Sequence, residues 1–275
     1  MKISDIENYL ALKNTHLNHD VFDEIEKHRY GAIEEKNEYL ANYYWCLKTI
    51  YSVQRAFLLA FKEMKTCKYE AAWANLDTAD IQLSGLSQNF DLGTENDRYH
   101  LVFISNIIKV YQSVFPYQYF LSRECVIKSE ECSICGKPVS LRKACRHRLG
   151  KLYMGEHCLH KVTDLEFKAV AIVKDPFDKY TYVKIDGQEY DYGIVKMLLS
   201  GLNNPYDKFW IEVLMVKSPE YRNVGRNDRC PCVSGLKYKK CHWGKPSELM
   251  KHHIVHFAKP TVGIKGVRYF GTWKE

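Results

Sequence analysis

The 275-residue sequence lacks the motifs that mark the common nucleotide-binding and hydrolytic folds. It contains no G-x-x-x-x-G-K-[ST] phosphate loop and no G-x-G-x-x-G fingerprint. It also contains no G-x-S-x-G nucleophile elbow and no H-E-x-x-H zinc-protease helix. An enzyme with an unrecognised active site is therefore the last of the hypotheses that we consider, and no catalytic residue is assigned.

Long apolar segments are missing as well. The longest strongly apolar run, AFLLAF at residues 56–61, is far shorter than the roughly 20 residues that a membrane-spanning helix needs. The first residues, MKISDIENYLALKN, contain no apolar signal-peptide core. We therefore expect a cytoplasmic protein with no transmembrane segment. In a reducing compartment, clustered cysteines are expected to be metal ligands rather than disulfides.

Positive charge is concentrated in two segments of the chain. The formal net charge is +7. Residues 126–160 have a net charge of +4 and residues 221–275 have a net charge of +9, whereas the other segments are net negative. The same two segments contain most of the ten cysteines. A positive field of this kind attracts anionic partners such as RNA, DNA or an acidic protein, although it also serves solubility alone.

The second of these segments contains four residues with the spacing of a metal site. Cys230, Cys232, Cys241 and His242 follow the pattern C-x-C-x8-C-H. Thiolate and imidazole are the ligands that Zn²⁺ prefers, and four of them complete a closed tetrahedral shell. The Ser234-Gly235 turn would reverse the chain and bring the second pair of ligands back to the first.

The whole stretch GRNDRCPCVSGLKYKKCHW, residues 225–243, resembles the SEC-C motif, a small zinc-binding tail of the translocase ATPase SecA that also occurs on unrelated proteins. It departs from the motif at Arg229, Val233 and Leu236, where Pro, Gly and Lys are usual. Val233 conflicts with a tight loop, because β-branched residues tolerate positive φ poorly. The resemblance implies a module that docks partner proteins, ribosomes or anionic surfaces. The expected contact residues are Arg226, Lys237, Tyr238, Lys239 and Lys240.

A second cysteine cluster lies in the middle of the chain. Cys132, Cys135, Cys145 and Cys158 form the pattern C-x2-C-x9-C-x12-C, which supplies a complete tetrahedral zinc site. His147 is an alternative to Cys145 as the third ligand. The stretch from Cys145 to Cys158 resembles short zinc-ribbon segments of bacterial and phage-related proteins. The sequence thus predicts two closed Zn²⁺ sites of structural type.

Basic and aromatic residues surround this central cluster, which favours an alternative function. Zinc knuckles with interleaved Lys, Arg and Tyr contact phosphates and stack on unpaired bases. The candidate nucleic-acid contacts are Arg142, Lys143, Arg146, Arg148, Lys151 and Tyr153.

The remaining sequence predicts an α+β protein with four segments. Residues 1–125 read as a helical domain, with a capping box at Ser4 and Glu7 and helices at 36–66, 69–86 and 97–121. Residues 126–160 form the zinc knuckle, and residues 221–275 form the SEC-C module with a basic tail. Residues 161–220 form a small mixed region, with strands at 168–174 and 180–185 around a turn at 175–178, a helix at 192–202, and a segment at 209–216 that is either strand or helix. Further strands are expected at 254–257 and 267–273.

Three functions are compatible with this organisation. The first is a non-enzymatic zinc-binding adaptor that recognises a protein or ribonucleoprotein partner, such as the ribosome, in bacterial stress or phage defence. The second is an RNA- or DNA-binding protein that uses the zinc knuckles, and the third is the enzyme with an unrecognised site.

Overall fold

The chain folds into two compact units. The computed structural model describes residues 1–93, 97–140, 142, 145–177, 179–258 and 267–269. The first unit comprises Met1–Ser113 and Tyr117–Lys184, and the second comprises Val114–Pro116 and Ile185–Glu275. Helices and small antiparallel sheets make it an α+β protein, as the sequence predicts.

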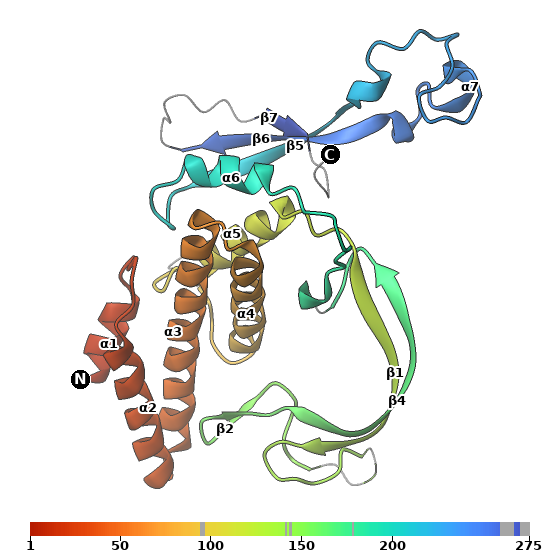
Figure 1. Ribbon diagram of the computed structural model, residues 1–275. Coiled ribbons are helices and arrows are strands. Elements are labelled where there is room, and N and C mark those ends of the chain that lie inside the picture. Colours follow the sequence, from red (N-terminus) through yellow and green to blue (C-terminus); the bar gives the residue numbers. More distant parts are fainter. Residues whose placement is uncertain (94–96, 141, 143–144, 178, 259–266, 270–275) are drawn as a thin grey trace. The chain divides into compact units, whose positions relative to one another are not determined.

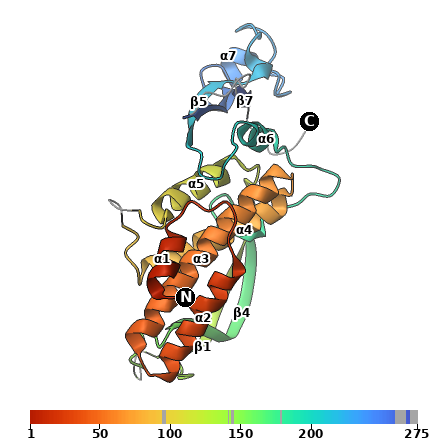
Figure 2. The same cartoon turned by 90° about the vertical axis from the view of Figure 1, so that its left-hand side faces the viewer.

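Five helices form the N-terminal part of the first unit (Figures 1 and 2). They are α1 (Ile3–Leu10), α2 (His19–Glu34), α3 (Glu38–Lys65), α4 (Tyr69–Ser87) and α5 (Leu101–Val114). The long helix α3 packs against α2 and α4, and its buried side chains, such as Ile50, Phe57 and Met64, recur at helical spacing. The helices predicted at 36–66 and 69–86 are confirmed. No helix in the described part of the chain is long and apolar enough to cross a membrane.

The N-cap of the first helix lies two residues before the predicted cap, Ser4. Lys2 is the N-cap, and its backbone N–H donates to the Asp5 carboxylate at 3.1 Å. The predicted capping pair, Ser4 and Glu7, is therefore wrong. The Glu7 carboxylate instead accepts a hydrogen bond of 2.6 Å from the Tyr43 hydroxyl, so it links α1 to α3.

A long antiparallel ribbon replaces the helix end and the hairpin that the sequence predicts. Helix α5 ends at Val114, and β1 (Phe120–Cys132) pairs with β4 (His160–Val173) from Phe120↔Val173 to Cys132↔His160. The predicted strand at 168–174 exists as part of β4, but its partner lies upstream. Residues 179–181 form the short helix η1 (Lys179–Thr181) rather than a strand.

The second unit is built on a three-stranded antiparallel sheet in the order β5-β6-β7. Its elements are α6 (Gly193–Ser200), β5 (Phe209–Lys217), β6 (Leu249–Phe257) and β7 (Val267–Tyr269). The predicted helix at 192–202 is confirmed, and the ambiguous segment at 209–216 is a strand. Gly201, at the end of α6, lies so close to Phe257 that an added Cβ would sit 2.3 Å from its ring. The rest of the predicted strand 267–273 lies outside the described residues.

The two cysteine-rich segments occupy equivalent places in this topology. Residues 133–159, with β2 (Leu152–Tyr153) and β3 (Glu156–His157), connect β1 to β4. Residues 218–248, with η2 (Pro219–Tyr221), α7 (Tyr238–Cys241) and η3 (Pro246–Glu248), connect β5 to β6. Each segment therefore forms the tip of an antiparallel strand pair, which we call a ribbon; in the second unit β7 also pairs with β6.

Candidate metal centres

The SEC-C segment brings its four predicted ligands together. The ligand atoms of Cys230, Cys232, Cys241 and His242 all lie within 4.8 Å of one another. The Cys232 and Cys241 sulfurs are 3.4 Å apart, and His242 Nδ1 lies 3.2 Å from the sulfurs of both Cys230 and Cys241. The first two ligands come from a loop and the other two from the end of α7.

These distances fit a tetrahedral ion after a slight expansion. With Zn–S near 2.3 Å and Zn–N near 2.0 Å, ligand atoms around zinc lie about 3.5 to 3.8 Å apart. The observed 3.2 to 3.4 Å is a few tenths of an ångström shorter. Three thiolates and one imidazole are a donor set that suits Zn²⁺ and leaves no open coordination position.

A tight loop orients the first two cysteines. Arg229 and Lys237 form an isolated bridge, and the Cys230 N–H donates to the Leu236 carbonyl at 2.9 Å. Val233 lies in the left-handed region with φ of 61° and is 92% exposed. The loop therefore takes the conformation that the sequence argument found unfavourable for a β-branched residue. Hydrogen bonds from the Ser234 side chain and backbone lower the pKa of the Cys232 thiol to about 6.

Aromatic residues form the core of this small module. Tyr238 is fully buried and stacks on Tyr221 with ring centroids 5.5 Å apart. Its hydroxyl donates to the Glu248 carboxylate, and the Lys217 ammonium lies 5.0 Å from the rings of both Tyr238 and Trp243. The sequence analysis placed Tyr238 among the surface contacts, but the structure makes it the centre of the module. Tyr238 is the first residue of the short helix α7, and the lysines on either side of it in the sequence are exposed.

The other expected contact residues lie on the surface of the module. Six basic residues between positions 226 and 245 are exposed, and Asp228 is the one acidic residue in that range. They are Arg226, Arg229, Lys237, Lys239, Lys240 and Lys245. Because the tip is small, these six side chains give much of its surface a positive charge.

The central segment contains a second cluster. The ligand atoms of Cys132, Cys135, Cys145 and His147 lie within 4.8 Å of one another, and His147 Nδ1 is 3.6 Å from the Cys132 sulfur. A knuckle turn with Gly136 at φ of +67° follows the first pair of cysteines. Burial raises the pKa of the Cys132 thiol, but hydrogen bonds from the Cys135 and Ile134 backbone outweigh it and bring the pKa to about 6.

The structure changes which residues compete for the fourth position. Cys145 and His147 lie together in the cluster rather than as alternatives. Cys158 is fully buried, and its sulfur is 3.8 Å from that of Cys132, which is a distance that two ligands of one zinc ion show. Burial raises the pKa of the Cys158 thiol to about 11. Five donors thus surround a position for four, and the ligand set stays a prediction.

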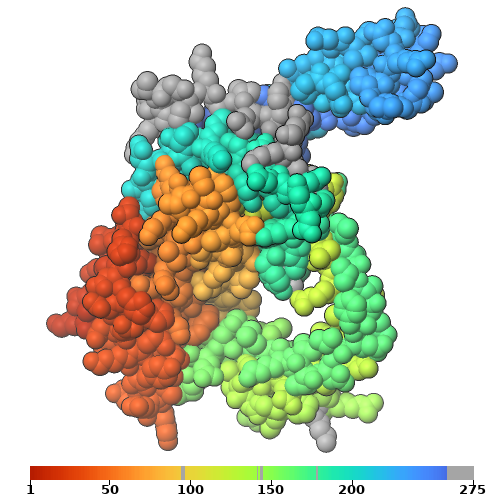
Figure 3. Space-filling model, viewed as in Figure 1, coloured from red at the N-terminus to blue at the C-terminus, as the bar shows by residue number. Residues whose placement is uncertain are grey.

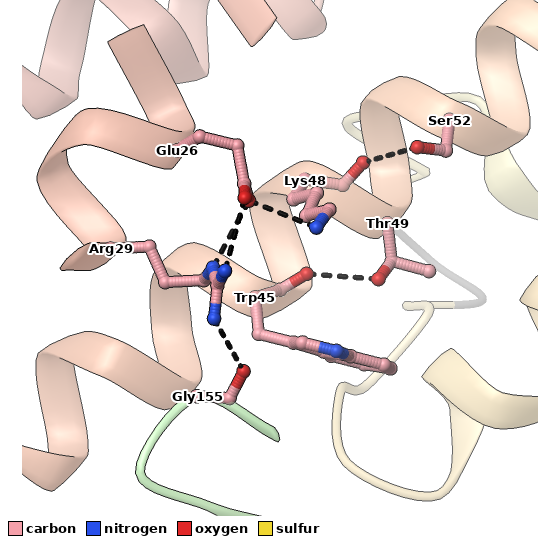
Figure 4. Close-up of polar contacts among 7 residues, drawn as sticks. All are labelled: Glu26, Arg29, Trp45, Lys48, Thr49, Ser52 and Gly155. Atoms are coloured by element: carbon pink, nitrogen blue, oxygen red, sulfur yellow. Dashed lines mark hydrogen bonds and ion pairs between the residues drawn. The ribbon is translucent and has the colours of Figure 1, made fainter. Parts of the chain in front are cut away.

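The central segment is attached to the helices by contacts that no sequence motif indicates (Figure 4). Arg29, 7% exposed on α2, is paired with Glu26 and donates to the Gly155 carbonyl at 3.1 Å. The Gly155 N–H donates to Asn42 on α3 at 2.7 Å. The side chain of His157 on β3 packs on Trp45 of α3 with ring centroids 5.2 Å apart.

The candidate nucleic-acid contacts of the central segment differ in accessibility. Arg142, Arg146 and Arg148 are exposed, whereas the Lys151 ammonium donates to the Gln88 carbonyl. Tyr153 is half-buried; its ring packs on His147, and its hydroxyl accepts from the Arg148 N–H at 2.8 Å. Lys143 lies outside the described residues.

Comparisons with known proteins match one part of the chain. The SEC-C motif family model matches residues 226–244. The protein translocase subunit SecA of Nocardioides sp. is 67% identical over 27 residues, which are 10% of this chain and 3% of the relative. SecA of Chloroflexus aggregans is 51% identical over 41 residues, 14% of this chain and 4% of the relative. No solved structure matches the chain.

The chain thus spans only a few per cent of the length of these curated relatives. The family-model match lies in the tip that holds Cys230, Cys232, Cys241 and His242. We conclude that residues 226–244 are a SEC-C motif, built here between two strands of a sheet.

Proposed function

We propose that this protein is a zinc-stabilised adaptor that recognises an anionic partner, a protein or a ribonucleoprotein such as the ribosome, through its SEC-C tip. The observation that carries the proposal is a closed four-ligand cluster inside a tip whose exposed charges are almost all basic. Structural zinc supplies folding free energy to segments too small to fold alone. Here it would hold the lysines of α7 in a fixed arrangement.

Both clusters are proposed to bind one Zn²⁺ each. The experiment measures metal content per chain on the purified full-length protein. We expect two zinc ions in the wild type and one in each of Cys230→Ser and Cys135→Ser. Two zinc ions in both variants would contradict the assignment of these ligands.

Partner recognition is tested by charge reversal on the exposed face of α7. The double variant Lys239→Glu, Lys240→Glu keeps all four ligands, and Lys196→Glu, which reverses an exposed lysine on α6, is the matched control. We expect the double variant to lose co-sedimentation with ribosomes, or capture of a bacterial partner, that the control retains. Equal behaviour of the two variants would overturn the proposal. In cells such an adaptor would act in the cytoplasm, in stress response or phage defence.

A second function is favoured by the exposed arginines of the central segment. Arg146 and Arg148 project from the surface beside the half-buried Tyr153, in a segment of net charge +4. A labelled single-stranded RNA would then bind with an affinity that falls steeply with salt. Weaker binding by Arg146→Glu, Arg148→Glu, with no effect of the α7 double variant, would identify this second function.

A further inference from the structure

The β1–β4 ribbon has one apolar and one polar face. Cross-strand partners share a face, and the register pairs Leu121↔Ile172, Arg123↔Val170, Cys125↔Phe167 and Ile127↔Leu165. We call these eight residues the inner face. Its six large apolar side chains are between 43% and 68% exposed, and Arg123 is its one formal charge.

The opposite face is different in character. It pairs Ser122↔Ala171, Glu124↔Ala169 and Val126↔Glu166. Val126 is its one large apolar side chain among these, and it is 48% exposed. The ribbon is therefore amphipathic like a strand pair that packs on a core, but its apolar side chains remain about half exposed among the residues that the structure describes. An isolated two-stranded sheet of this kind is marginal in water.

The ribbon is attached near both ends to α4 or to the residues that follow it. Near one end, Phe120 stacks on Trp73, and the Trp73 indole donates to the Lys179 carbonyl of η1 at 2.8 Å. Near the other end, the central segment contacts the turn after α4, where the Asn89 amide donates to the Gly150 carbonyl at 2.7 Å. Both attachments lie within the first unit.

The ribbon is longer than the helix segment that it connects. The 13 residues of β1 extend ~40 Å at about 3.3 Å per residue. The part of α4 from Trp73 to its end at Ser87 rises ~21 Å at 1.5 Å per residue. The strands bow away from α4 in Figure 1, and Figure 3 shows an opening between the ribbon and the helices.

The inner face is turned toward this opening. Arg123 donates to the Tyr180 hydroxyl of η1 at 3.3 Å, and η1 is held on α4 by the Lys179–Asp80 ion pair. Figure 1 shows η1, in teal, on the concave side of the ribbon. A pocket of about 290 Å³ on the ribbon is lined by Leu121, Cys125, Ile127, Leu165 and Phe177, among others.

We propose that the opening binds an extended apolar polypeptide segment that carries an acidic residue. A folded domain does not fit between the ribbon and the helices, because they are connected near both ends of the ribbon, whereas an extended chain does. The aliphatic lining with a single positive charge disfavours nucleic acid, which requires several phosphate contacts. Arg123 complements a carboxylate, which it can bind through a charge-assisted hydrogen bond. This site is separate from the SEC-C tip.

The probe is a fluorescein-labelled peptide of roughly ten residues, a typical strand length, that alternates Val and Thr around one central Glu. A second peptide carries Lys in place of Glu. We expect the full-length protein to bind the Glu peptide more tightly, as measured by fluorescence anisotropy. Ile127→Asp and Phe167→Asp should each weaken binding about tenfold or more. Val126 lies next to Ile127 on the opposite face of the ribbon and has similar exposure, so Val126→Asp should leave binding unchanged.

Two further variants make the result decisive. Arg123→Gln should remove the preference for the Glu peptide over the Lys peptide. The α7 double variant should bind the peptide normally, so a failure of the peptide-binding proposal can be told apart from a failure of the adaptor proposal. Absence of peptide binding, or an equal loss in Val126→Asp, would overturn the inference. A wild-type dimer in sedimentation equilibrium that Ile127→Asp alone converts to monomer would also overturn it, because the inner face would then belong to a second copy.

Discussion

Among single residues, Val233 holds the least favourable backbone conformation in the SEC-C loop. A left-handed residue with a branched Cβ costs about 1–2 kcal/mol relative to glycine. Because the Val233 side chain is 92% exposed, its loss removes almost no packing. We expect Val233→Gly to stabilise the metal-loaded tip by ~1 kcal/mol, measured by urea unfolding. Gly235→Ala, at φ of +73° with no neighbour within 4 Å of the added Cβ, should destabilise it instead; stabilisation by both changes would refute the explanation.

Tyr238 illustrates how much of the site the residue pattern could predict. The ligand spacing was enough to bring Cys230, Cys232, Cys241 and His242 into one group, because a short loop leaves few other arrangements. The inward direction of Tyr238 could not be predicted, since it depends on stacking with Tyr221, which lies upstream of the motif. Tyr238→Ala should cost about 3 kcal/mol of stability. Tyr238→Phe should cost less, because it removes only the bond to Glu248.

Thiol reactivity distinguishes the remaining cysteines from the ligands. Cys67 and Cys125 are exposed, whereas Cys46 is 4% exposed and burial raises the pKa of its thiol to about 11. We expect a thiol-reactive dye to label two cysteines quickly in zinc-loaded protein, a third only on unfolding, and the clustered ones only after chelation. Rapid labelling of most thiols in loaded protein would show that the clusters are not ligands.

At the level of elements, the hairpin β2–β3 depends on a close approach to α3. Gly155, with φ of +74°, lies so near the helix that an added Cβ would sit 3.1 Å from the Ala41 carbonyl oxygen. Gly136, in the same unit, has φ of +67° and nothing within 4 Å, so it is a matched control for backbone strain alone. We expect Gly155→Ala to lower the stability of the first unit by more than the ~1 kcal/mol of Gly136→Ala. Equal losses, measured by thermal unfolding, would mean that the contact contributes nothing.

The sequence predicted helices better than strands, for a physical reason. The stripe along α3 is local and repeats over several turns, so its period is visible in one segment. Strand β1 contains Arg123, Glu124, Lys128, Glu130 and Glu131, and its partner β4 begins 28 residues after it ends. A strand is defined by its pairing, and the sequence does not indicate which segment pairs with β4. The sequence therefore predicts the nearer segment 180–185 as the partner, whereas the actual partner is β1.

At the level of the molecule, metal removal should affect the two units separately. Each unit contains one cluster at a ribbon tip, and the central tip is attached to the helices through Arg29 and Gly155. We expect chelation to lower two transitions in calorimetry. Cys135→Ser should lower only that of the first unit, and Cys230→Ser only that of the second. A single transition that both variants lower equally would show that the units unfold together.

The placement of both clusters at ribbon tips has a consequence for how the chain folds. Strands β1 and β4 are separated by residues 133–159, and β5 and β6 by residues 218–248, so each pairing must first close a loop at an entropic cost. An ion bound at the tip closes part of that loop before any strand pairs. The cross-strand pairs next to the tips are Cys132↔His160, which contains a candidate ligand, and Lys217↔Leu249 at the base of the SEC-C segment. The ribbons should therefore zip from the metal outward, and refolding should be faster when zinc is present at the start than when it is added after the chain has collapsed.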